Sequence, residues 1–322
     1  MRTVFGHILA VVGISLLLSA CGGKGGRVQT VQAPRAFPQP PQAPSVMSEP
    51  AEIYGYIADH FWDSFLDKHY PGDSSLVNGV RADDVESALG RYVTLLETFC
   101  ERGKATKSVE GFFKKVSDFQ ANNPTSNVFG FFERMVPKYL YDPNSPVRDE
   151  DLYHPYVKGL ATSEIVREEM RPAYSRDAEM CSLNRVGTKA ADIIFTGLDG
   201  RKRTLYGIKA KNTLLFFSNP GCPACEDVIR QLTGNEAISG KISSGKLAVV
   251  NIYIDLEIDK WKASASVYPK TWHNGYDQNY TIRKDLTYNV RAIPSLYVLD
   301  EDKRVVMKDA PVEKVIPYLE NI

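Results

Sequence analysis

A strand pattern that runs directly into a pair of cysteines constrains the fold of this chain more than any other feature. Thr213–Phe217 and Leu247–Ile254 are continuous apolar runs, typical of strands covered on both faces. Between them lies a stripe with the spacing of one helix face, made of Cys225, Val228, Ile229 and Leu232. Strand, helix and strand in this order predict a parallel pair of strands joined by a crossover helix.

Two hairpin patterns flank this unit. Ile193–Phe195 and Arg203–Leu205 lie on either side of a Leu-Asp-Gly turn, and Ser295–Leu299 and Arg304–Met307 flank a run of four charged residues. Val312–Leu319 then predicts a final helix. The sequence therefore predicts an α/β domain over residues 184–322.

In the region before this domain, the apolar residues follow a different spacing. From Glu52 to about Met180 apolar residues recur at helical spacing, and Val/Ile runs are absent. Helix breakers such as Pro71-Gly72 and Asn122-Asn123-Pro124 separate the stripes. We expect an all-α domain of five or six short helices over residues 49–183.

The N-terminus has the layout of an export signal. A basic residue is followed by an apolar run, Ile8–Leu18, that is too short to span a membrane as a helix. Leu18-Ser19-Ala20-Cys21 resembles the site cut by the lipoprotein signal peptidase, although an ordinary signal peptide with a chance cysteine is the alternative. We expect residues 1–20 to be removed and Cys21 to be lipid-modified. The chain would then be anchored in a bacterial envelope and face the periplasm, with the outer membrane favoured over the inner one.

Residues 21–48 are rich in proline and poor in apolar periodicity. Such a segment favours extended, solvated conformations, so we expect a semi-rigid linker between the lipid and the folded part. The chain has 39 basic and 39 acidic residues, which gives no electrostatic reason to expect nucleic-acid binding.

The spacing of Cys222 and Cys225 suits thiol chemistry. A helix start offers unpaired N–H groups that stabilise a thiolate on Cys222, and Cys225, one turn later, is placed to attack a mixed disulfide on Cys222. A zinc site would need two more ligands, and only His273 follows, so we expect no metal and no cofactor. A purely structural disulfide is the other interpretation. For Cys100 and Cys181, buried thiols and a mutual disulfide both remain open.

Residues 185–322 resemble the thioredoxin superfamily, in particular its TlpA/ResA-like branch of envelope thiol:disulfide proteins. The leading hairpin, the Cys-Pro-Ala-Cys motif and Ala292-Ile293-Pro294-Ser295 before a strand carry the resemblance. It implies that Pro294 is the cis-proline facing the cysteines and that the backbone of Ile293 pairs with an extended substrate. The sequence departs from the family at Gly221, usually tryptophan, and at Phe216, which is acidic in thioredoxin.

The acid missing at Phe216 has two candidate replacements, Asp255 and Glu257, which follow the strand Leu247–Ile254. Acidic residues after a strand are, however, more often exposed turn residues than functional groups. In the helical part, Ile53–Asp63 and Tyr139–Tyr153 resemble an uncharacterised domain that precedes thioredoxin-like domains in lipoproteins of anaerobic gut bacteria.

These features predict an envelope thiol:disulfide oxidoreductase, with disulfide reduction the favoured direction. Its expected partners are disulfide-containing envelope proteins and a membrane electron donor that re-reduces the pair. The alternative is a binding protein in which the helical domain recognises an envelope partner and the thioredoxin-like fold serves as a platform.

The lipid-anchor hypothesis makes the first prediction. Cys21→Ala removes the sulfur that would carry the lipid, so it should abolish fatty-acid labelling and release the protein from the membrane fraction. Metabolic labelling and cell fractionation measure both effects. Unchanged membrane association of the variant would contradict the hypothesis.

Overall fold

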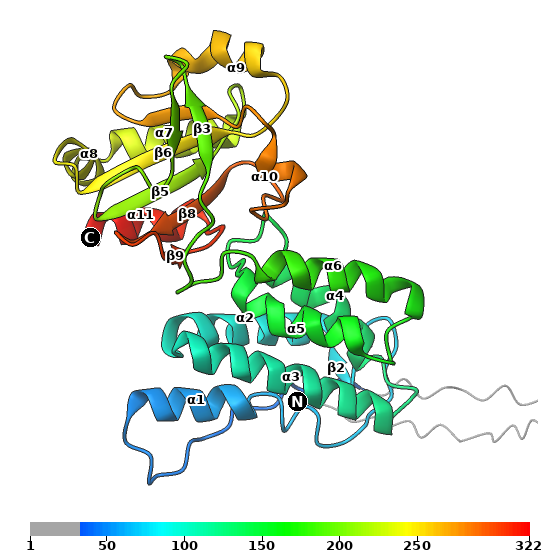
Figure 1. Cartoon of the computed structure of the whole chain (residues 1–322). Coiled ribbons are helices and arrows are strands. Elements are labelled where there is room, and N and C mark those ends of the chain that lie inside the picture. The colour runs from blue at the N-terminus through cyan, green and yellow to red at the C-terminus, as the bar shows by residue number, and fades with distance from the viewer. Residues whose placement is uncertain (1–32) are drawn as a thin grey trace, which may run out of the picture. The chain divides into compact units, whose positions relative to one another are not determined.

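The computed structural model describes residues 33–322, and Pro34–Ile322 form one compact unit (Figure 1). The predicted signal segment and Cys21 lie outside the described residues. None of the described helices has both the length and the apolar character needed to cross a membrane.

The N-terminal part of this unit is helical, as predicted. Its helices are α1 (Pro50–His60), α2 (Ala82–Phe99), α3 (Arg102–Asn122), α4 (Val128–Leu140), α5 (Glu150–Thr162) and α6 (Arg171–Ser182). A two-stranded ribbon, β1 (Leu76–Val77) with β2 (Val80–Arg81), precedes α2. The apolar stripes of these helices meet in one aromatic-rich core, in which Trp62 stacks on Phe112 and packs edge-on against Phe132.

Part of the predicted linker differs from the expected solvated segment. The backbone N–H of Arg35 donates to Gly79 at 2.8 Å, and its guanidinium donates to the carbonyl of Phe65. Phe37 stacks on Phe65 at 5.5 Å between ring centroids and packs against Trp62. The ring of Phe37 and the hydrogen bonds of Arg35 together hold this stretch on the helical core.

The C-terminal part contains a seven-stranded mixed sheet. Its spatial order is β4-β3-β7-β6-β5-β8-β9. The strands are β3 (Ile194–Gly197), β4 (Lys202–Thr204), β5 (Asn212–Phe217), β6 (Leu247–Tyr253), β7 (His273–Tyr276), β8 (Ser295–Leu299) and β9 (Val305–Met307). The pair β5 and β6 is parallel, and β5 and β8 are antiparallel, so β5 lies inside the sheet.

Helices cover both faces of this sheet. On one face α7 (Pro223–Gly234), α8 (Glu236–Ser243) and α11 (Val312–Asn321) bury apolar side chains against β5, β6 and β8. On the other, Ile282 of α10 (Thr281–Lys284) packs with Tyr288 and residues of β3 and β5. Trp261 of α9 (Ile258–Ser264) packs with tyrosines that include Tyr253 and Tyr276.

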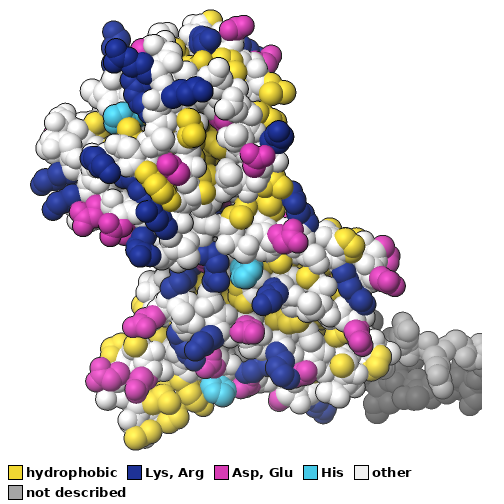
Figure 2. Space-filling view, in the orientation of Figure 1, with side chains coloured by type: hydrophobic (Ala, Val, Ile, Leu, Met, Phe, Trp, Pro, Cys, Tyr) yellow, Lys and Arg dark blue, Asp and Glu magenta, His cyan; other side chains and the backbone are white. Residues whose placement is uncertain are grey.

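This architecture confirms the predicted fold class, an all-α region followed by a thioredoxin-like α/β region. The strand β7 and the helices α9 and α10 lie between β6 and Pro294, in the long segment that separates Cys225 from Pro294. On the face seen in Figure 2, acidic and basic side chains are interspersed, in keeping with the balanced charge of the chain.

Packing of the segment before α1 generates a stability prediction. Phe37→Ala should lower the free energy of unfolding by roughly 1–3 kcal/mol, because the partly buried ring would leave its contacts with the helical core. Denaturant unfolding monitored by tryptophan fluorescence measures the change, since Trp62 contacts this ring. The exposed Pro40→Ala is the matched control from the same segment. Equal stability of both variants would show that the segment does not pack.

Candidate active site

The two cysteines lie where the central strand β5 passes into α7. Phe217, the last residue of β5, is buried, and the chain then turns through residues 218–221. Gly221 has φ +75°, a left-handed conformation that glycine adopts at little cost. This conformation gives a local reason for glycine where the family usually has tryptophan. Cys222 follows as the N-cap of α7, and Pro223 occupies the first turn, where no N–H is needed.

The two thiols differ in exposure. Cys222 is half-buried, and its Sγ accepts a hydrogen bond from the backbone N–H of Cys225 at 3.4 Å. Cys225 is fully buried, and burial raises the pKa of its thiol, with a further contribution from its hydrogen bond to Cys222. Both are free thiols in this structure. Only the first sulfur is therefore open to an incoming protein chain.

Residues 293 and 294 lie beside the first thiol. The carbonyl oxygen of Ile293 is 3.9 Å from Cys222 Sγ, within reach of a weak S–H···O contact. The Ile293–Pro294 peptide bond is cis, which is the geometry expected for a member of the superfamily. The fold thus brings together four of the residues singled out in the sequence, although 71 positions separate Cys222 from Ile293.

A buried polar cluster beneath this turn escaped the sequence analysis. Ser218 donates to the side-chain oxygen of Asn251 at 2.5 Å and lies 3.1 Å from the hydroxyl of Tyr268. Burial raises the pKa of Tyr268 to about 12, against the lowering effect of its hydrogen bond with Ser218. Asn251 was the available signal, because a polar residue inside the buried run of β6 needs a hydrogen-bond partner.

The two acids weighed as proton acceptors for Cys225 have other partners. Asp255 accepts from Asn219 at 2.7 Å and from Arg283 at 2.9 Å, and the exposed Glu257 pairs with Lys260. Phe216 is buried in the apolar cluster that contains Cys225. Among the described residues, no carboxylate hydrogen-bonds to either thiol of the motif.

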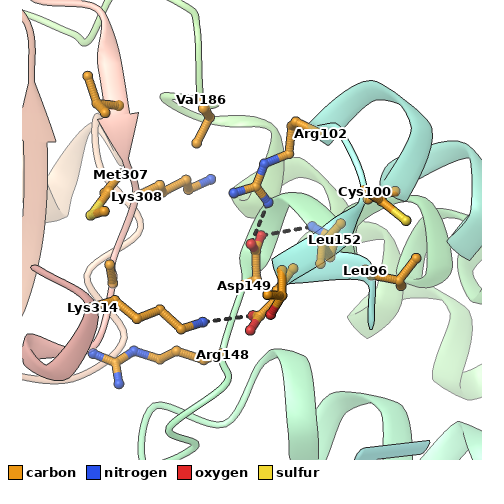
Figure 3. Close-up of a pocket in the computed structure, with 15 residues that line it drawn as sticks. Leu96, Cys100, Arg102, Arg148, Asp149, Leu152, Val186, Met307, Lys308 and Lys314 are labelled. Atoms are coloured by element: carbon orange, nitrogen blue, oxygen red, sulfur yellow. Dashed lines mark hydrogen bonds and ion pairs between the residues drawn. The ribbon is translucent and has the colours of Figure 1, made fainter. Parts of the chain in front are cut away.

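The remaining cysteines lie elsewhere. Cys100 and Cys181 are both free, so the structure contains no bridge between them. Cys100 lines a cavity of about 500 Å³ together with Arg102, Lys308 and Lys314 (Figure 3), and the residues lining it do not include Cys222 or Cys225. Within residues 33–322, no cluster of three or more His, Cys, Asp or Glu side chains could hold a metal ion.

Comparison with known proteins gives matches to both regions. Residues 20–184 match the domain of unknown function DUF5106, and a search of curated proteins finds no match. A thioredoxin-like protein from Bacteroides caccae is 31% identical with a TM-score of 0.74, over 87% of this chain and 97% of that one. The C-terminal domain of an uncharacterized protein from Bacteroides fragilis is 46% identical with a TM-score of 0.41, over 42% of this chain and 97% of that domain.

The difference in exposure between the thiols predicts their order of reaction. Brief iodoacetamide treatment of the reduced protein near neutral pH should label Cys222 about tenfold or more over Cys225, because the buried thiol is shielded and its thiolate disfavoured. Peptide mass spectrometry locates the label, and Cys222→Ser is the control that should lose it. Preferential labelling of Cys225 would reverse the assigned roles.

Proposed function

Because the chain belongs to the thioredoxin-like proteins and carries the DUF5106 domain in its N-terminal half, we propose that it is a thiol:disulfide oxidoreductase acting through Cys222 and Cys225. The observation that carries this proposal is the asymmetry of the pair. One thiol is half-exposed at the start of α7, and the other is buried one turn further on. Such a pair suits attack by one sulfur and resolution by the other.

In the proposed reaction, the thiolate of Cys222 attacks one sulfur of a substrate disulfide. A mixed disulfide forms, and the other substrate sulfur leaves as a thiolate. Cys225, once deprotonated, attacks Cys222 Sγ, closes the disulfide within the motif and releases the substrate's second sulfur. Two electrons pass from the cysteine pair to the substrate. The backbone of Ile293, whose carbonyl lies next to Cys222 Sγ, is placed to pair with an extended substrate chain.

Reduction of disulfides is the proposed direction, on the resemblance to the TlpA/ResA-like branch. Each cycle then needs a dithiol donor to re-reduce Cys222 and Cys225, and we assign this role to a membrane-bound electron donor. The lipoprotein-like Leu18-Ser19-Ala20-Cys21 supports an envelope location facing the periplasm, and the outer membrane is favoured. The proposed substrates are disulfide-containing proteins of that compartment.

Trapping of substrates tests the proposal directly. Cys225→Ser leaves the first attack possible and removes the resolving sulfur, so mixed disulfides with natural partners should accumulate. Non-reducing gels of cells that express the variant in its own envelope should show new bands that disappear on reduction. Their mass-spectrometric identification would give the substrates.

Two further variants serve as controls for trapping. Cys222→Ser/Cys225→Ser should trap nothing, and Cys222→Ser alone should trap little because Cys225 is buried. If Cys225→Ser gives no adducts beyond those of the double variant, the chain does not exchange disulfides with envelope proteins. The partner-binding interpretation would then be favoured.

A further inference from the structure

A buried group of charged side chains joins the helical region to the segment that carries Ile293 and Pro294. Glu150, at the start of α5, is buried. Its Oε1 accepts hydrogen bonds from Asn289 Nδ2 at 3.0 Å and from Arg291 Nε at 2.9 Å. One carboxylate oxygen of the helical region therefore holds two side chains that closely precede Ile293.

The same guanidinium reaches a second buried carboxylate. Arg291 Nη2 donates to Asp309 Oδ2 at 2.8 Å, and Ser295 Oγ donates to the other oxygen of Asp309 at 2.6 Å. Residues on both sides of Ile293–Pro294 are thus fixed by one connected network. We refer to residues 289–295 as the proline segment.

The helical region supplies further contacts to this network. The guanidinium of Arg291 lies over the ring of Tyr141, 4.1 Å from its centroid. Arg148 Nε donates to the backbone carbonyl of Asp309 at 2.8 Å. Lys308 Nζ lies 2.9 Å from Glu150 Oε2 and donates to the carbonyl of Cys181 at 2.7 Å. In each of these contacts one group belongs to the helical region. The helical region therefore holds both the proline segment and the residues that follow β9.

We infer that Glu150 is a positioning residue for the redox site, which holds the proline segment so that the carbonyl of Ile293 stays beside Cys222. The inference rests on the proposed function and gives the helical region a part in it. Without this carboxylate, Arg291 and Lys308 lose a buried partner and must find others, because an unpaired buried charge is costly. The proline segment would then shift, and the contact between the Ile293 carbonyl and the Cys222 thiol would be lost.

The matched control is a second ion pair between the same two regions. Lys314 of α11 reaches Glu97 of α2 at 2.7 Å, at the cavity drawn in Figure 3. Glu97 has no hydrogen bond to the proline segment, and Lys314 is its ion-pair partner. Glu97→Gln therefore removes a contact between the two regions without touching the segment beside Cys222.

The test compares Glu150→Gln with Glu97→Gln in the purified full chain. Alkylation of Cys222 near neutral pH should become about two- to fivefold faster in Glu150→Gln, since the shifted segment no longer holds the Ile293 carbonyl in its weak contact with the sulfur. The Cys222/Cys225 pair should also be more oxidised at a given glutathione ratio, because the dithiol loses a stabilising contact. Glu97→Gln should match the wild type in both measurements.

Arg291→Lys provides a second variant should Glu150→Gln fold poorly. Lysine keeps the charge but lacks the fork that contacts Glu150 and Asp309 together, so the same two shifts are expected. Circular dichroism and the unfolding midpoint establish that each variant is folded. Wild-type alkylation rates and glutathione equilibria in the folded Glu150 or Arg291 variant would overturn the inference. Alkylation requires neither substrate nor electron donor, so its outcome is independent of whether trapping succeeds.

Discussion

The arrangement of Glu150 and Asp309 constrains much of the rest of the molecule. Their side chains are 1% and 5% exposed, and a carboxylate in such a place is tolerated only when cations and hydrogen-bond donors surround it. Burial and the nearby Glu150 raise the pKa of Asp309, while Arg291 and Arg148 act in the opposite direction. Because these groups come from both the helical and the α/β region, charge pairing ties the helical region to the residues that precede β8 and follow β9.

The α/β fold could be predicted because its signals are local. Thr213–Phe217 and Leu247–Ile254 are buried runs that are apolar except at Thr213 and Asn251, and they form the strands β5 and β6. The strand β7 could not be predicted, since His-Asn-Gly-Tyr has no strand pattern and pairs only because β3 and β6 lie on either side of it. The proline-rich stretch was predicted to be solvated throughout, yet Phe37 packs on the helical core. The composition of the stretch could not show this contact, because it depends on residues elsewhere in the chain.

The residues of the site also fall into those that the sequence could predict and those that it could not. Cys222 and Cys225 were predictable because strand, motif and helix are contiguous, and Pro294 entered through the family resemblance. The burial of Glu150 could not be predicted, since an acidic residue at the start of a helix is ordinarily exposed to solvent, where it interacts with the helix dipole. Its partner Arg291 is 141 positions away, and only the tertiary structure shows that both are buried. Side-chain networks that cross between regions leave no periodic trace in a sequence.

The full burial of Cys225 has a consequence for the order of encounters. Cys222 is the half-buried sulfur of the motif, so under the proposed function an oxidised substrate and the reductant that restores the dithiol would both have to approach this sulfur, and would do so in turn. A mixed disulfide at Cys222 would occupy the one sulfur of the motif that the other partner needs, so electrons would pass by alternation of partners.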